Sequence, residues 1–303
     1  MNQTTPPVAL ADATRLGLVR LQIADLARSL AYYQETLGFQ LLEHDADSAT
    51  LGTADGTPLV QLAARAGARR APAQGRLGLY HFAILLPDRA SLGRLIAHLA
   101  DRAERFGASD HLVSEALYLR DPDGLGIEVY VDRPRSSWRR EQGQIAMDTA
   151  PLDLESVVRD SAGAPWTGMP NGTQVGHVHL HVGDLAAASD FYHGALGFER
   201  TVWSYPGALF LAAGGYHHHL GLNTWAGAGA ANPRDDDARL LEWTIVLPSA
   251  EQVQETAARL ERAAHPVQRD EHGARATDPW GTSVRVADEE SYARLTARGG
   301  ASR

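Results

Sequence analysis

Residues 16–39 read LGLVRLQIADLARSLAYYQETLGF, and residues 175–198 read VGHVHLHVGDLAAASDFYHGALGF. Both stretches begin with alternating apolar residues, which is the pattern of a β-strand, and continue with apolar residues at the spacing of a helix. Each contains an aromatic pair and closes on LGF, so that Gly38 lies where the C-cap of a helix is expected. The chain therefore contains an internal duplication, and this repeat determines the fold that we expect.

A second pair of matching segments extends the repeat. Residues 79–88 (LYHFAILLPD) correspond to residues 241–249 (LEWTIVLPS), and each is followed downstream by a DPxG turn, at 121–124 and at 278–281. A strand, a helical stretch and shorter β-rich runs thus recur four times along the chain. We therefore expect an α+β protein built from four βαβββ modules.

The modules divide the chain into two halves with a long connector between them. The connector is rich in proline and contains one helical candidate, residues 153–159. It is longer than a plain loop needs to be. We expect modules one and two in residues 14–131, the connector in residues 132–173, and modules three and four in residues 174–288.

The composition limits the chemistry. The 303 residues carry a formal net charge of −9 and include 13 histidines but no cysteine. Disulfides, zinc–thiolate sites, iron–sulfur clusters and a cysteine nucleophile are therefore excluded, and a transition metal would need imidazole and carboxylate ligands. The acidic balance argues against nucleic-acid binding.

Other patterns are also missing from the sequence. It has neither a GxGxxG nor a Walker-type loop for nucleotide phosphates. No apolar run is long enough to span a membrane, and the start MNQTTPP lacks the pattern of a secretion signal. We therefore expect a cytoplasmic enzyme without a membrane partner, and leave open whether it forms a homo-oligomer.

The repeated D-L, aromatic-pair and LGF pattern resembles the vicinal oxygen chelate superfamily of glyoxalases and extradiol dioxygenases. Residues 78–87 (GLYHFAILLP), 109–134 and 214–225 (GGYHHHLGLNTW) resemble the catechol-2,3-dioxygenase branch in particular. The resemblance implies that two βαβββ modules curl into one cup-shaped barrel around a metal. Four modules would then form two cups.

The resemblance also implies where metal ligands are found. The family takes them from the first strand of a module, seven residues before the D-L aspartate, and from the last strand. The first-strand positions are Leu18, His81, His177 and Glu242, and the last-strand positions of modules two and four are Glu128 and Arg285.

This chain departs from the family arrangement, which usually takes two histidines and a glutamate from modules three and four. Arg285 is positively charged and has no acceptor atom, so it is a poor ligand. A complete set, His81, His177 and Glu128, exists only if modules two and three share a cup. The connector permits that crossover within one chain, and exchange between two copies would also permit it. The alternative, sequential pairing of the modules, leaves two incomplete cups.

The resemblance assigns further residues to the same cup. His218 matches a histidine that moves a substrate proton, although the sequence does not decide which of His217, His218 and His219 faces inward. Tyr118 and His111 match substrate-contacting positions. The alternatives are that the three consecutive histidines form a solvated run, that Tyr118 is a half-buried strand residue, and that His111 lies in a surface loop.

Three more side chains are expected around the substrate. His177, His179 and His181 fall on one face of a strand, and three imidazoles do not build an apolar core, so we expect His179 to orient a ligand or the substrate. His219 and Asn223 are expected to contact the substrate or its immediate surroundings.

The resemblance implies an extradiol ring-cleaving dioxygenase of aromatic catabolism, which opens a catechol with O2 at mononuclear Fe(II) or Mn(II). One alternative is a glyoxalase-like metal-dependent isomerase or lyase, in which Gln61 would contribute a ligand. A second alternative is a non-catalytic protein that binds a small molecule.

Overall fold

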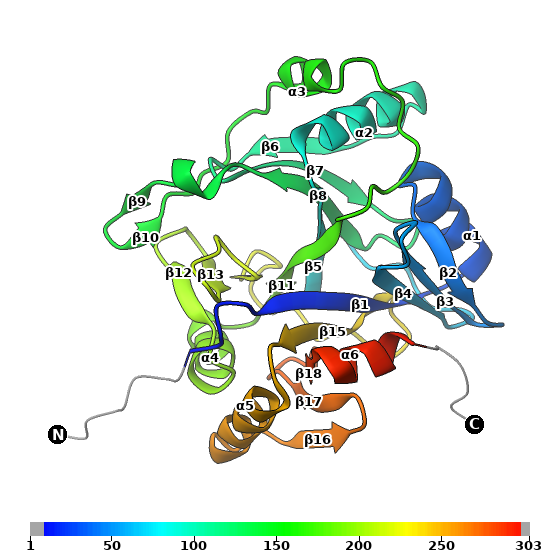
Figure 1. Cartoon of the computed structure of the whole chain (residues 1–303). Coiled ribbons are helices and arrows are strands. Elements are labelled where there is room, and N and C mark those ends of the chain that lie inside the picture. Colours follow the sequence, from blue (N-terminus) through cyan, green and yellow to red (C-terminus); the bar gives the residue numbers. More distant parts are fainter. Residues whose placement is uncertain (1–8, 298–303) are drawn as a thin grey trace.

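The computed structural model describes residues 9–297, which form two curled eight-stranded sheets with helices outside them (Figure 1). Module one consists of β1 (Arg15–Ile23), α1 (Leu26–Ala31), η1 (Tyr32–Thr36), β2 (Gln40–His44), β3 (Ser48–Gly52) and β4 (Pro58–Ala64). Module two consists of β5 (Gly78–Leu85), α2 (Arg89–Asp101), β6 (Gly107–Asp110), β7 (Ser114–Arg120) and β8 (Gly126–Asp132). The connector holds η2 (Arg135–Ser137), β9 (Arg140–Glu141), β10 (Gln144–Ile145) and α3 (Leu154–Asp160).

The second half repeats this order. Module three consists of β11 (Gln174–His181), α4 (Leu185–Ser189), η3 (Asp190–Ala195), β12 (Glu199–Val202), β13 (Ala208–Ala212) and β14 (Leu220–Asn223). Module four consists of β15 (Arg239–Leu247), α5 (Ala250–Arg262), β16 (Val267–Asp270), β17 (Gly273–Thr277) and β18 (Ser283–Asp288), and α6 (Glu289–Thr296) follows it. The predicted α+β fold of four βαβββ modules in two cups is confirmed.

The sheets do not follow the order of the modules along the chain. One sheet has the strand order β16-β17-β18-β15-β1-β4-β3-β2 and therefore combines modules four and one. The other has the order β12-β13-β14-β11-β5-β8-β7-β6 and combines modules three and two. Each sheet thus combines one module that precedes the connector with one module that follows it. The predicted boundaries at residues 132–173 therefore describe the order of the modules along the chain, and they stay a prediction.

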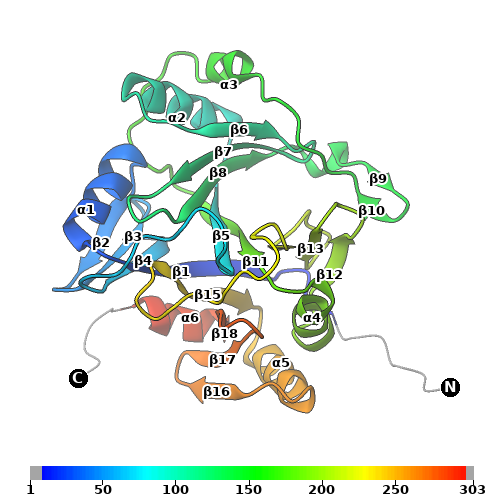
Figure 2. The same cartoon turned by 180° about the vertical axis from the view of Figure 1, so that it is seen from behind.

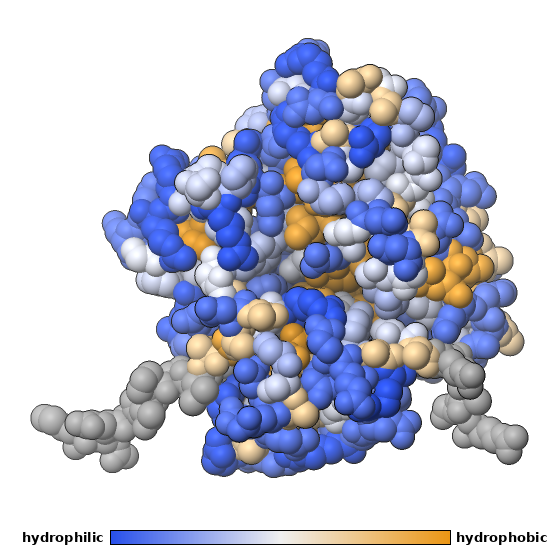
Figure 3. Space-filling view, in the orientation of Figure 1, coloured by the Kyte–Doolittle hydropathy of each residue, from blue (hydrophilic) through white to orange (hydrophobic). Residues whose placement is uncertain are grey.

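The connector allows this crossover within one chain. Figure 2 shows it leaving β8, passing β9 and β10 at the edge of the upper sheet, and reaching α3 beside α2. Hydrophilic residues cover most of the face in Figure 3. Within residues 9–297, no helix is long and apolar enough to cross a membrane.

The repeated sequence motifs have local structural roles. Asp25 caps α1 by accepting a hydrogen bond from the amide of Arg28, and Asp184 caps α4 in the same way. The predicted single helix before Gly38 is in fact α1 followed by a π-helical turn, η1. Gly38 has a φ of +80°, and a Cβ there would lie 2.6 Å from the Cα of Gly168 in the connector, so only glycine fits.

The DPxG turns are fastened by buried aspartates. One carboxylate oxygen of Asp121 accepts hydrogen bonds from two backbone amides of its own turn, and the other accepts from the hydroxyl of Tyr33 in module one. Asp278 has the same arrangement with Tyr192 of module three. Burial raises the pKa of Asp121 to about 7 and also raises the pKa of Asp278.

We expect Asp121 to make stability depend on pH. Its folded-state pKa of about 7 lies above the ordinary value of 3.8, so the folded protein binds this proton more tightly than the unfolded chain does. The resulting stabilisation is fully present below the ordinary pKa and is lost as the pH rises through the folded-state value. Asp121→Asn keeps an acceptor oxygen for the turn amides but cannot ionise. Urea unfolding should show a smaller fall in the free energy of unfolding from acidic to neutral pH in this variant, and an unchanged slope would contradict the assignment.

Candidate metal centre

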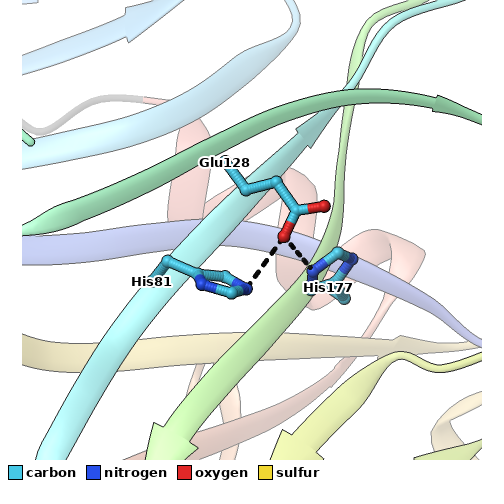
Figure 4. A group of neighbouring side chains, drawn as sticks. All are labelled: His81, Glu128 and His177. Carbon is cyan, nitrogen blue, oxygen red and sulfur yellow. Dashed lines mark hydrogen bonds and ion pairs between the residues drawn. The ribbon is translucent and has the colours of Figure 1, made fainter. Parts of the chain in front are cut away.

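Three strands of the sheet formed by modules two and three bring two histidines and a glutamate together. His81 lies on β5, and β5 pairs with both β8, which carries Glu128, and β11, which carries His177. Nε2 of His81 lies 2.9 Å, and Nε2 of His177 3.1 Å, from the same carboxylate oxygen of Glu128. Figure 4 shows the three side chains converging from their strands. Their ligand atoms all lie within 4.8 Å of one another.

All three side chains are almost fully buried. Burial alone would raise the pKa of Glu128, but its contacts with His177 and His81 hold that pKa well below its ordinary value. Burial lowers the pKa of His81 despite the opposing pull of Glu128. The group therefore offers an ionised carboxylate and a neutral imidazole at neutral pH, which are the protonation states that bind a metal.

The donor atoms fit a divalent cation. Although Nε2 of His81 lies close to Glu128, the angles do not make a hydrogen bond, and this buried nitrogen has no hydrogen-bond partner among the described residues. Leaving a buried polar atom unpaired is costly, and a cation would satisfy it. Two imidazole nitrogens and one carboxylate on one side of a site form the ligand set of non-haem iron(II) centres.

The group lies at the wall of a cavity of about 230 Å³. Glu128 and His81 belong to its lining. The rest of the lining includes five aromatic side chains, Tyr80, Tyr118, Tyr205, Phe210 and Trp225, together with Ser109, His111, Met147, Asp148, Thr149, His179 and His218. The cavity can hold a small aromatic molecule next to His81 and Glu128.

The structure places Tyr118 and His111 together in this lining. Nδ1 of His111 lies 2.8 Å from the carbonyl oxygen of Asp148 and must donate to it, since a carbonyl only accepts. In neutral His111, Nε2 is then an acceptor, and the hydroxyl of Tyr118 donates to it over 2.6 Å. His111 therefore fixes the direction of the Tyr118 hydroxyl at the cavity wall.

The three consecutive histidines occupy the loop before β14 rather than the strand. His218 lines the cavity, with its ring centroid 4.1 Å from that of His177. His219 packs against Phe198 and accepts a hydrogen bond from the amide of Ala213, and its contact with the substrate or its surroundings stays a prediction. His217 is completely buried, and its Nε2 lies 2.8 Å from Oδ1 of Asp132.

Asn223 also lies behind the lining instead of in it. It is fully buried, and its Nδ2 donates to Nε2 of His179 over 2.9 Å while its Oδ1 accepts from His181. Asn223 therefore holds His179, which lines the cavity, in place, and its contact with the substrate itself stays a prediction. A Cβ at Gly221 would lie 2.7 Å from the His179 ring, which explains the glycine there.

Comparisons with known proteins agree with this arrangement. The family model of the glyoxalase/bleomycin resistance protein/dioxygenase superfamily matches residues 15–129 and 174–286. The chain belongs to this superfamily. It is 44% identical over 272 residues to a catechol-2,3-dioxygenase of Bacillus subtilis (strain 168), covering 88% of this chain and 95% of that protein.

Solved structures share the superfamily fold at low sequence identity. A candidate dioxygenase from Bacillus subtilis subsp. subtilis str. 168 has a TM-score of 0.63 at 13% identity and covers 95% of this chain and 88% of its own. Glyoxalase I from Zea mays has a TM-score of 0.58 at 18% identity, with 94% and 95% covered.

The other cup of this superfamily member has different side chains at the corresponding positions. Glu242 on β15 accepts a hydrogen bond from Nε of Arg285 on β18 over 2.8 Å, and Arg285 also pairs with Asp270. Leu18 on β1 contributes no polar atom. A guanidinium thus balances this partly buried carboxylate, whereas the group of His81, Glu128 and His177 includes no arginine or lysine.

Several cavity residues escaped the sequence analysis. Trp225 lines the cavity and is 42% exposed. Tyr80 alternates with His81 on β5, and Tyr205 and Met147 belong to loops. Met147 comes from the connector, and no periodic pattern in the sequence signals that such a loop returns to the cavity.

We expect the metal site to depend on Glu128. Glu128→Gln removes the charge that attracts a divalent cation while nearly keeping the side-chain volume, so Mn(II) should bind at least ~100-fold more weakly in anaerobic calorimetric titrations. Glu155→Gln, on the exposed surface of α3, is the matched control and should bind Mn(II) as the unaltered protein does. Equal affinities in the two variants would show that this group is not the metal site.

Proposed function

We propose that this protein is an extradiol ring-cleaving dioxygenase that opens a catechol-type substrate with O2 at Fe(II) or Mn(II). The observation that carries the proposal is the group formed by His81, His177 and Glu128, which borders an aromatic cavity. The identity to a protein named catechol-2,3-dioxygenase supports the same reaction. A cytoplasmic location and a place in aromatic catabolism stay predictions.

Metal binding would fall to His81, His177 and Glu128. When bound, the metal supplies a Lewis acid and a path for electrons between the catechol ring and O2. No arginine or lysine is among the described residues that line the cavity, so the positive charge that attracts an ionised catechol comes from the metal.

The cavity walls position the ring of the substrate. Phe210, Trp225 and Tyr205 offer aromatic faces and edges, and Phe210 also packs against the His218 ring with centroids 5.0 Å apart. Aromatic walls bind an aromatic ring and exclude water from it. A catechol would therefore lie with its hydroxyls toward the candidate ligands and its hydrocarbon edge against these walls.

His218 is proposed to take a proton from the catechol. Burial, together with the neighbouring histidines, holds the pKa of His218 well below its ordinary value, so the ring is neutral and able to accept a proton. Tyr118 is proposed to bind the substrate or the ring-opened product through its phenolic oxygen, with His111 fixing the direction of its proton. Burial raises the pKa of Tyr118 well above its ordinary value, so this side chain stays protonated.

The glyoxalase-like alternative takes Gln61 as one contributor to a set of four ligands. Gln61 lies on β4 in the other sheet, opposite Arg20, and not beside the His81 group. The non-catalytic alternative differs from the proposal in a measurable way, because it requires no O2 consumption.

We expect the protein loaded anaerobically with Fe(II) or Mn(II) to consume O2 when catechol is added. His218→Gln should lower kcat by about 10²–10³-fold, because it removes the proton acceptor while the candidate ligands remain. His98→Ala, a histidine replacement on α2, is the control and should keep the activity of the unaltered protein. Absence of O2 uptake from the unaltered, metal-loaded protein would refute the proposed function, and full activity of His218→Gln would refute the role of His218.

A further inference from the structure

His217 is completely buried next to the cavity, and the proposed function gives it no role. Both of its ring nitrogens are engaged. Nε2 lies 2.8 Å from Oδ1 of Asp132, and Nδ1 lies 2.7 Å from Nδ1 of His218. Asp132, His217 and His218 therefore form one hydrogen-bonded chain that ends at the cavity wall.

For a neutral His217 and an ionised Asp132, the donors and acceptors of the three groups give this chain one direction. An ionised carboxylate only accepts hydrogen bonds, so Nε2 of His217 donates its proton to Asp132. A neutral imidazole carries one proton, so Nδ1 of His217 is then an acceptor, and Nδ1 of His218 must donate to it. His218 in turn keeps an unprotonated Nε2.

We propose that Asp132 and His217 are positioning residues that hold His218 in the tautomer with a proton on Nδ1 and a free lone pair on Nε2. The side-chain hydrogen bond of His218 to His217 uses Nδ1, and His218 belongs to the cavity lining. Nε2 of His218 is therefore the nitrogen that can accept a proton from a bound substrate. The tautomer assignment stands independently, whereas its use in catalysis rests on the proposed function.

The surroundings hold the chain of hydrogen bonds in place. The hydroxyl of Tyr216 donates to the same Asp132 oxygen over 3.2 Å and lies 2.6 Å from the hydroxyl of Tyr130. The ring of Trp138, from the connector, packs against His217 with centroids 5.2 Å apart. Asp132 itself ends β8, four residues after Glu128, and residues at that spacing share one face of a strand. The candidate ligand and the positioning carboxylate are thus placed by the same strand.

A doubly protonated His217 would reverse the second hydrogen bond. Its Nδ1 would then donate to His218, whose proton would be on Nε2, and the substrate would meet a donor instead of an acceptor. The two arrangements make opposite predictions for the nitrogen spectrum of His218.

The first test reads the tautomers directly in the metal-free full-length protein labelled with 15N-histidine. Long-range 1H–15N correlation spectra should show His218 protonated at Nδ1 and His217 protonated at Nε2, with the signals assigned from single histidine variants. Asp132→Ala should mix the two tautomers of His218, because His217 loses the acceptor that orients it. A His218 protonated at Nε2 in the unaltered protein, or an unchanged His218 signal in Asp132→Ala, would overturn the proposal.

The second test separates positioning from general structural support. Asparagine at position 217 places an oxygen near the site of Nδ1 and can accept from His218, whereas glutamine places its polar atoms near Nε2 and can satisfy only Asp132. We expect His217→Gln to lower kcat for catechol by about 10²-fold with KM within about twofold, and His217→Asn to recover about tenfold of that loss. Equal kcat values in the two variants would overturn the positioning role.

The outcomes also distinguish this inference from the proposed function. If the unaltered protein consumes no O2 with catechol, the proposed function fails, and the tautomers of His217 and His218 still decide the structural assignment. If O2 uptake is found but the 217 variants do not differ, the proposed function stands and the positioning role fails.

Discussion

The antiparallel pairing of β5 with β11 is the contact on which the site depends. It joins module two to module three and places His81 directly opposite His179, two residues from His177. β8 pairs with β5 on its other side and adds Glu128, so that three neighbouring strands direct one side chain each toward one point. Backbone hydrogen bonds between strands fix this geometry, because a shift of one residue in either pairing would move a ligand to the opposite face of the sheet.

The two sheets share one arrangement of modules but carry different side chains at the corresponding positions. Both are built from a pair of modules, and both place a glutamate near the seam. In one, the partly buried Glu242 is paired with Arg285 of the same chain, and in the other, the buried Glu128 meets two imidazoles that bring no fixed charge. A buried carboxylate needs a compensating positive charge. The first sheet supplies this charge with an arginine side chain, whereas the second offers the ligand atoms for a cation, which explains why one candidate site is found within residues 9–297.

The connector contributes to both the fold and the cavity. Its length lets modules two and three meet within one chain, and its segment from Met147 to Thr149 forms part of the cavity wall. The carbonyl of Asp148 orients His111, which orients Tyr118, while Trp138 covers His217. The contacts of both histidine pairs, His111 with Tyr118 and His217 with His218, therefore involve a segment that lacks the module pattern.

The sequence by itself determined the four modules, because alternation of apolar residues, helix periodicity and the capping residues Asp25 and Asp184 act over short distances. The resemblance to the superfamily then pointed to His81, His177 and Glu128 as a complete ligand set, on the condition that modules two and three share a cup. Only the tertiary structure decided which modules share a sheet, because strand pairing between distant segments leaves no local pattern. It also decided the directions of the side chains of His217, His218, His219 and Asn223. These residues lie in a short loop and at a strand end, where the direction of a side chain follows from its hydrogen-bond partners. Partners such as Asp132 and His179 lie far away in the chain, and only the fold brings them near.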